Sequence, residues 1–270
     1  MDERKARNRM KPLSMLYVGL VYAFLYLPIV VVVLFSFNSS KLNIQFEGFT
    51  LEWYSKMFQN ELLMNAFWNT IIVAAVSTFL STTIGTLCAV GLNRFEFKLK
   101  KLVSTTLYIP IVIPELVFGI AMLILFSSIH MPMNLFTLIV SHVTFSLPFV
   151  VITVRSRLAG FDRSIEEAAR DLGANEIHTF FRVTLPMIAP GVISGAMLAL
   201  TLSLDDVVVS FFTSGPESQT LPLRILGMVK KGISPDVNAL STLMIVGTVS
   251  ILLMTTLIQN KMEKRDEIEK

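Results

Sequence analysis

Residues 164–186 read SIEEAARDLGANEIHTFFRVTLP, a charged segment between two long apolar runs at 135–154 and 187–209. Ser164 and Glu167 match the S-x-x-E capping box, in which each side chain accepts a backbone N–H from the first helical turn. A helix is therefore predicted to begin at Ser164.

The same segment contains signals for a turn and a second helix. Gly173 is the expected end of the first helix, because glycine tolerates the left-handed conformation that ends many helices. A second short helix is predicted to start at Asn175, before Leu185 and Pro186 lead back into an apolar run. The predicted unit is a helix, a glycine turn and a helix.

The first of these helices is amphipathic. Ile165, Ala168, Ala169 and Leu172 share one face at helical spacing, and the charged residues take the other face. Such a helix either lies on a lipid surface or docks against another protein. Lipid-facing amphipathic helices favour bulky Leu, Phe and Trp side chains, so the alanine pair favours docking.

The rest of the chain consists mainly of apolar runs. Of its residues, 53% are hydrophobic and 16% are charged, and the mean hydropathy is +0.65, which is typical of an integral membrane protein. The runs reach the roughly 20 residues that cross a hydrocarbon core of about 30 Å. We predict an all-α, polytopic membrane protein with a single transmembrane domain over residues 1–270. Its six spans are predicted near 13–37, 66–92, 103–128, 135–154, 187–209 and 239–259.

Basic residues predict the orientation, because Lys and Arg accumulate on the cytoplasmic side of membrane proteins. Most of the 23 Lys and Arg residues fall in the N-terminal segment, the second-to-third connection, the fourth-to-fifth connection and the C-terminal tail. The exceptions are Lys41, Lys56, Arg224, Lys230 and Lys231. Both termini and the segment 161–186 are therefore predicted to be cytoplasmic.

Several kinds of chemistry have no motif in this sequence. A G-x-x-x-x-G-K-[ST] phosphate loop is absent, so P-loop binding of ATP by this chain is excluded. The single cysteine, Cys88, has no intrachain disulfide partner, and His130, His142 and His178 have no carboxylate or thiolate at ligand spacing. Neither G-x-S-x-G nor H-E-x-x-H occurs. We predict no catalytic residue, no metal site and no cofactor in this chain.

Three carboxylates lie within otherwise apolar runs: Glu115, Asp205 and Asp206. An acid at mid-bilayer costs about 2.5 to 3.5 kcal/mol on insertion scales, so such residues usually face protein or a water-filled path. A count of about 1.5 Å per residue along straight helices puts all three in the outer half of the membrane. There they are expected to line one path, in which the ammonium groups of a cationic substrate would offset their repulsion.

Each of these acids also has a structural alternative. Adjacent residues differ by about 100° around a helix, so one aspartate is expected to cap or break the span. Glu115 follows Pro114, and it would alternatively satisfy backbone groups that a kink at Pro110 and Pro114 releases. Small residues also recur at helical spacing, and they serve close packing either within this chain or against a partner. They are Ser81, Gly85, Ala89, Gly191, Gly195 and Ala199.

The segment that opens this section resembles a known motif. Glu167, Ala168 and Ala169, then Gly173, then Leu185 and Pro186 are similar to the EAA loop of permease subunits of binding-protein-dependent ABC importers. The resemblance implies the type I importer permease (MetI-like) fold, with cytoplasmic coupling helices between the fourth and fifth spans. It also implies that the motif residues couple the permease to a separate ATPase subunit. Those residues are Glu167, Ala168, Ala169, Gly173, Leu185 and Pro186.

Further segments resemble the permeases of spermidine/putrescine importers within that family. They are FSFNSS (35–40), EAARDLGA (167–174), LSLDDVVVS (202–210), TSGP (213–216) and SPDVNAL (234–240). The resemblance implies a non-catalytic subunit of the bacterial inner membrane that moves polyamines. The implied partners are membrane lipid, a homologous second permease, an ATPase dimer that uses ATP and Mg, and a periplasmic polyamine-binding protein; none is a nucleic acid. Import of another small solute, or gradient-driven transport by this chain alone, remains as an alternative.

Overall fold

The structure is a computed structural model that describes residues 2–40, 45–160, 162, 164–229 and 235–268. The chain divides into two compact units, one formed by residues 1–61 and 228–249 and the other by residues 62–227 and 250–270. Each unit is described by itself. Several residues that the sequence analysis names or includes in a range lie outside the described residues: Lys41, Phe161, Arg163, Lys230, Lys231, Ser234, Glu269 and Lys270.

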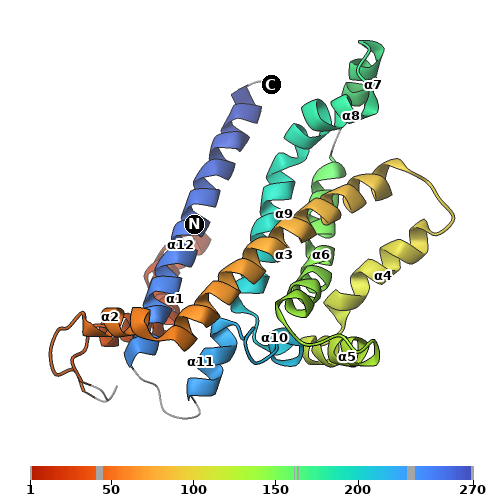
Figure 1. The fold of residues 1–270 in the computed structure, drawn as a ribbon. Coiled ribbons are helices and arrows are strands. Elements are labelled where there is room, and N and C mark those ends of the chain that lie inside the picture. Colours follow the sequence, from red (N-terminus) through yellow and green to blue (C-terminus); the bar gives the residue numbers. More distant parts are fainter. Residues whose placement is uncertain (1, 41–44, 161, 163, 230–234, 269–270) are drawn as a thin grey trace. The chain divides into compact units, whose positions relative to one another are not determined.

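Helices account for almost all of the regular structure in the described residues, which confirms the predicted all-α class. The one exception there is an isolated bridge between Asn38 and Phe49. The helices, labelled where there is room in Figure 1, are α1 (Asp2–Phe35), α2 (Glu52–Gln59), α3 (Glu61–Arg94), α4 (Lys100–Val112), α5 (Glu115–Ser128), α6 (Leu135–Leu158), α7 (Ser164–Asp171), α8 (Glu176–Thr179), α9 (Leu185–Asp205), α10 (Val208–Thr213), α11 (Leu221–Val229) and α12 (Pro235–Ile268), with a π-helical turn at Phe180–Thr184.

Five of the described helical stretches are long and apolar enough to cross a membrane: Met15–Phe35, Glu61–Arg94, Leu135–Leu158, Glu176–Asp205 and Pro235–Leu257. The helices α4 and α5 meet the same criterion only when they are taken together. If this pair counts as one broken span, the described residues contain six candidate spans.

The first unit contains a structured loop after α1. Asn38 is fully buried there, and its side-chain amide donates to the Gln45 carbonyl (2.7 Å) while its Oδ1 accepts the Glu47 N–H (2.9 Å). The indole N–H of Trp53 on α2 donates to the Asn38 carbonyl (2.6 Å). The FSFNSS segment therefore has a structural role in this loop.

The third predicted span differs from the single helix expected at 103–128. The chain turns by 113° between α4 and α5, at Ile113 and Pro114. A residue before proline is driven toward extended backbone, and Ile113 has ψ 134°. Proline also cannot donate the N–H that would continue the helix. The single straight helix predicted for this span therefore ends at Val112, three residues before Glu115.

The fifth predicted span also differs at both ends from 187–209. Its helix runs from Glu176 to Asp205 through the π-helical turn, in which the Leu185 N–H bonds to the Phe180 carbonyl five residues back. The helix ends at Asp205 because Asp206 is extended (φ −62°, ψ 128°), and the short α10 follows. One aspartate does break the span, as the sequence predicts.

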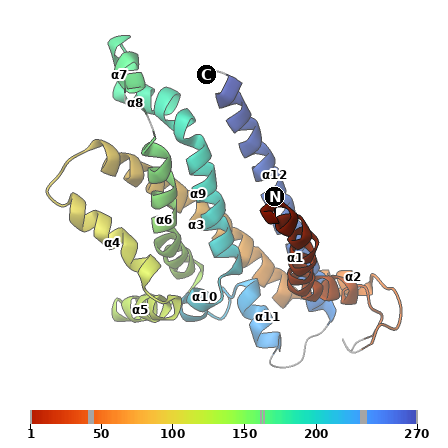
Figure 2. The same cartoon turned by 180° about the vertical axis from the view of Figure 1, so that it is seen from behind.

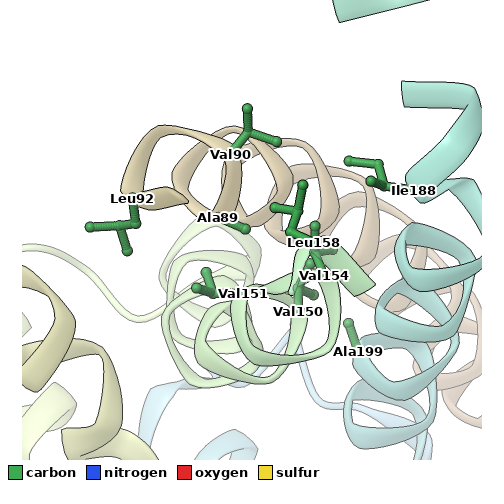
Figure 3. Packing of buried hydrophobic residues seen from close by; sticks show 9 residues of the cluster. All are labelled: Ala89, Val90, Leu92, Val150, Val151, Val154, Leu158, Ile188 and Ala199. Atoms are coloured by element: carbon green, nitrogen blue, oxygen red, sulfur yellow. The ribbon is translucent and has the colours of Figure 1, made fainter. Parts of the chain in front are cut away.

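The core of the second unit is formed by α3, α6 and α9. Figure 3 shows the buried residues that these helices contribute: Ala89, Val90, Leu92, Val150, Val151, Val154, Leu158, Ile188 and Ala199. A Cβ at Gly85 on α3 would lie 2.8 Å from Val150 Cγ1, and one at Gly195 on α9 would lie 3.3 Å from Val150 Cα. Because both glycines face Val150 of α6, the small residues there serve packing within this chain.

Two ends of this unit concern function. At one end of α9, α5 and α10 lie side by side, and at the other end stand α7 and α8 (Figures 1 and 2). The three intramembrane acids belong to the first end, and the EAA-like motif belongs to the second.

Candidate functional site

The helix α7 begins at Ser164, as the sequence predicts, but its cap differs from the predicted box. The Ser164 N–H donates to Asp162 Oδ1 (2.9 Å), so Ser164 is the first helical residue and the acceptor lies before it. This backbone bond, helped by the Ser164 hydroxyl, lowers the pKa of Asp162. An S-x-x-E pattern does not by itself distinguish these two arrangements, because Asp also caps helices well.

The predicted stop and restart are confirmed. Gly173 has φ +91°, and the Gly173 N–H bonds to the Arg170 carbonyl (2.8 Å) while the Ala174 N–H bonds to the Ala169 carbonyl (3.1 Å). This pair of bonds is the Schellman motif. The Asn175 side chain then accepts the His178 N–H (2.8 Å) and caps α8. The turn between the two helices is therefore fixed by backbone geometry.

Glu166 joins α7 to two other elements. Its carboxylate pairs with the guanidinium of Arg94, at the end of α3, and accepts a hydrogen bond from the Thr184 hydroxyl in the π-helical turn. Arg94 also donates to Thr184 Oγ1 (2.8 Å). Burial acts to raise the pKa of Glu166, but the Thr184 hydroxyl and the Arg94 guanidinium outweigh it and hold that pKa below its usual value. The Glu166 side chain thus faces the protein, whereas the helical pattern placed it on the polar outer side.

The apolar side of α7 is exposed. Ile165 is 40% exposed and Leu172 is 90% exposed, and in the following helical turns Ile177 and Phe181 are 72% and 60% exposed. Four exposed large apolar side chains at this end of the unit form a surface that suits either a partner protein or the lipid surface. We call Ile165, Leu172, Ile177 and Phe181 the apolar docking patch.

The EAA-like residues differ in their exposure. Glu167, Ala168, Gly173 and Pro186 are exposed, Ala169 is half-buried, and Leu185 packs against the α3–α6–α9 core. A cavity of about 210 Å³ opens beside them. Its lining is almost entirely charged: Arg94, Phe95, Glu166, Glu167, Arg170 and Glu176.

At the other end of α9, Asp206 is buried and fully bonded. Its Oδ1 accepts the Val209 N–H (3.1 Å), and its Oδ2 accepts the N–H (2.7 Å) and the hydroxyl (2.6 Å) of Ser210. Asp206 therefore caps α10, where a carboxylate is also favoured by the helix dipole.

Asp206 has a partner that the sequence pattern did not reveal. His142 of α6 places Nε2 3.3 Å from Asp206 Oδ2 and 3.2 Å from Ser210 Oγ, and its Nδ1 lies 2.7 Å from Ser203 Oγ. The Ser77 hydroxyl of α3 donates to Ser203 Oγ (3.2 Å). The sequence pattern does not point to His142, because no carboxylate lies at ligand spacing from it. The available signal was a lone ionisable residue in an apolar run.

The structure brings Glu115 to the same place. It is the first residue of α5, the helix that packs against α10, and its carboxyl interacts electrostatically with Asp206. Asp205, in contrast, is exposed at the last position of α9. Within the part of the chain that the structure describes, no Lys or Arg forms an ion pair with any of the three acids. In the predicted cluster, Asp206 is thus the buried cap of α10, Glu115 is its neighbour and Asp205 is the exposed carboxylate.

Comparison with known proteins gives one family for this chain. Residues 81–265 match the family described as "Binding-protein-dependent transport system inner membrane component". The chain is similar to the spermidine/putrescine transport system permease protein PotC of Escherichia coli (strain K12), with 44% identity over 238 residues, 88% of this chain and 90% of that protein. It is 40% identical to the putrescine transport system permease protein PotI of the same strain, over 86% of this chain and 84% of that one.

A solved structure shares the fold. A chain of a bacterial ABC transporter involved in the import of the acidic polysaccharide alginate superposes with a TM-score of 0.72 at 13% identity, covering 94% of this chain and 97% of that one. At this identity the likeness concerns architecture alone, and it agrees with the importer permease fold expected from the EAA-like motif.

Proposed function

Because the chain belongs to the family of binding-protein-dependent transport system inner membrane components, we propose that it forms half of the translocation path of an ATP-driven polyamine importer. The segment 161–186 is its coupling segment, and a separate ATPase binds there. The observation that carries the substrate assignment is the exposed Asp205 carboxylate, which lies at a helix break beside Glu115 and Asp206 with no basic ion-pair partner among the described residues.

The coupling role rests on two features of α7. One side carries Ile165, the first residue of the apolar docking patch, which continues through Leu172 into the next helical turns and suits a protein groove. The other side is fixed through Glu166 to α3 and to the π-helical turn before α9. A force applied to the exposed side is therefore passed to α9, the helix whose far end carries Asp205. ATP and Mg act in the partner ATPase dimer, and this chain contributes no catalytic group.

The substrate class follows from charge and from the relatives. The named function of both similar Escherichia coli permeases is transport of spermidine and putrescine, or of putrescine. Polyamines are flexible chains of ammonium groups, and carboxylates bind such cations through charge-assisted hydrogen bonds. Asp205 is the acid that is free to bind one, and Glu115 lies beside it. The further partners are a homologous second permease that completes the path, a periplasmic polyamine-binding protein on the outer side and the surrounding lipid; both termini are cytoplasmic.

Reconstitution tests the proposed function directly. The complete importer in liposomes is expected to accumulate labelled spermidine or putrescine only with ATP, and an excess of unlabelled polyamine should compete whereas sulfate should not. This chain alone should show no gradient-driven uptake. Uptake by the chain alone, or competition by sulfate but not by polyamine, would refute the proposal.

The coupling role has its own test in Gly173→Asp. The left-handed φ of Gly173 disfavours any side chain, and an aspartate adds charge next to the docking patch. We expect the assembled complex to lose most of its transport-linked ATPase activity. Gly160→Asp is the matched control, because a Cβ at Gly160 meets no atom within 4 Å and its φ is ordinary. Normal assembly with unchanged transport-linked ATPase activity in Gly173→Asp would contradict the coupling role.

A further inference from the structure

His142 is the centre of a buried polar chain that the proposed transport function does not explain. The exposed fractions of the His142 and Asp206 side chains are both 2%. Burial of so many polar groups is unfavourable unless every one is hydrogen-bonded. A network of this kind that is complete usually fixes one local geometry.

One assignment of protons satisfies the whole chain. The Ser77 hydroxyl donates to Ser203, the Ser203 hydroxyl donates to Nδ1 of His142, and the Nε2–H of His142 is directed at Asp206 Oδ2 and Ser210 Oγ. Ser210 Oγ can accept there because its own hydrogen is donated to Asp206 (2.6 Å). The donors thus point in one direction, from α3 through α9 and α6 to the acid.

The acid at the end of this chain sets the local backbone. The Asp206 carboxylate accepts the N–H groups of Val209 and Ser210 in the first turn of α10. Asp206 is also the residue at which α9 ends. Asp205 is the preceding residue, so the direction of its carboxylate depends on where α9 ends. A shift of Asp206 would move the end of α9 and Asp205 with it.

We propose that His142 is a positioning residue for the cation site: it fixes Asp206 as the cap of α10 and so directs the Asp205 carboxylate into the substrate path. The expected effect of His142 on transport rests on the proposed function, whereas the contact between His142 and Asp206 is independent of it. Asp206 then acts as a structural acid, and Asp205 is the acid that meets the substrate.

The test compares three substitutions of His142 with a matched control in the complete importer. His142→Gln keeps a side-chain N–H near the position of Nε2 and so keeps a donor to Asp206. His142→Asn places its N–H near Nδ1, toward Ser203, and His142→Ala keeps neither. Ser146→Ala is the control, because it removes another buried hydroxyl of α6, one that in the described part of the chain bonds only the helix's own backbone (2.6 Å to the His142 carbonyl).

Two measurements are made on each variant. The first is amide hydrogen exchange in peptides that cover 207–213, which reports whether α10 is still capped. The second is labelled polyamine uptake as a function of concentration, which separates KM from Vmax. His142→Ala and His142→Asn are expected to exchange about tenfold faster and to raise KM about tenfold with Vmax within about twofold, a loss of about 1.4 kcal/mol. His142→Gln and Ser146→Ala should stay within about threefold of the unmodified protein on both measures.

Each outcome decides a separate point. Unchanged exchange in His142→Ala would show that His142 does not hold Asp206, and the proposal would be wrong. Faster exchange with an unchanged KM would show that the cap does not position the cation site, which also overturns it. If the unmodified importer takes up no polyamine, the proposed function fails, and the exchange measurement still decides whether His142 fixes Asp206.

Discussion

The contact between Arg94 and Glu166 offers a sharp test of how α7 is held. Arg94→Ala leaves the buried Glu166 carboxylate with the Thr184 hydroxyl as its hydrogen-bond partner among the described residues, and with the more distant charge of Arg170. Loss of one partner of a fully buried ion pair costs about 3 to 5 kcal/mol, and a hydrogen bond to a charged group contributes about 1.5 to 3 kcal/mol. The Arg94 and Glu166 side chains are 17% and 9% exposed, so partial screening places the effect near the lower of these ranges, at about 2 kcal/mol.

This free energy should appear as local opening of α7. About 2 kcal/mol corresponds to roughly a 30-fold larger open population, and amide exchange in peptides covering 164–173 measures that population. Lys100→Ala is the matched control. It removes the cation of a Lys–Glu pair, but the partner, Glu96, is 87% exposed, so we expect less than about 1 kcal/mol and little change in α7 exchange.

A double-mutant cycle isolates the contact itself. If Arg94 and Glu166 interact directly, Arg94→Ala combined with Glu166→Ala should destabilise α7 by about 1 to 2 kcal/mol less than the sum of the single substitutions. Additive effects, or equal exchange in Arg94→Ala and Lys100→Ala, would refute the conclusion that this ion pair fixes α7 to α3.

Three further predictions follow from the geometry. Because the pKa of Glu166 is lowered in the folded protein, its contribution to the stability of α7 should be complete above the usual carboxyl pKa of 4.5 and be lost as the pH falls below it. Amide exchange of α7, corrected for the pH dependence of the intrinsic exchange rate, measures this stability. A loss of stability when the pH is raised would contradict the prediction. A Cβ added at Gly173 meets no atom within 4 Å, but the residue has φ +91°, so Gly173→Ala should cost about 1 to 2 kcal/mol from backbone strain alone. This cost should appear as faster proteolysis of the segment 164–186, whereas Gly160→Ala should be neutral. Gly85→Ala forces a Cβ to 2.8 Å from Val150 Cγ1 and should destabilise the purified complex by about 1 to 3 kcal/mol in thermal unfolding. Gly91→Ala on the same helix, where a Cβ meets no atom within 4 Å, should be neutral or stabilising. Equal effects of the two substitutions would contradict the packing of Gly85 against Val150.

Local signals in the sequence predicted much of this fold correctly. Apolar runs of membrane-spanning length located the long helices, Gly173 marked a left-handed turn, and Asn175 marked the start of α8. These features depend on residues within a few positions of one another, so a pattern of neighbours suffices to find them. The EAA-like motif likewise indicated the family from a short segment.

Two of the errors concern contacts between residues far apart in the chain. Glu166 was placed on an outer polar face because helical periodicity does not report that Arg94, 72 residues away, compensates its charge. The role of His142 depends on Ser203 and Ser210, which are 61 and 68 residues away. The 113° turn at Pro114 was noted only as a possible kink, because a proline in an apolar run is compatible with both a bent span and a broken one.

Labelled spermidine uptake by the reconstituted importer, with and without Asp205→Asn, tests the proposed substrate path most directly. Loss of a charge-assisted contact of about 1.5 to 3 kcal/mol should raise KM by about 10- to 150-fold without preventing assembly. Glu217→Gln is the control, since this exposed acid lies in the 214–220 loop, on the same predicted outer side, and only its backbone carbonyl bonds to Asn69 among the described residues. ATP-dependent uptake with a raised KM in Asp205→Asn and an unchanged KM in Glu217→Gln is the expected result. Unchanged spermidine uptake in Asp205→Asn would contradict the assignment of the cation path.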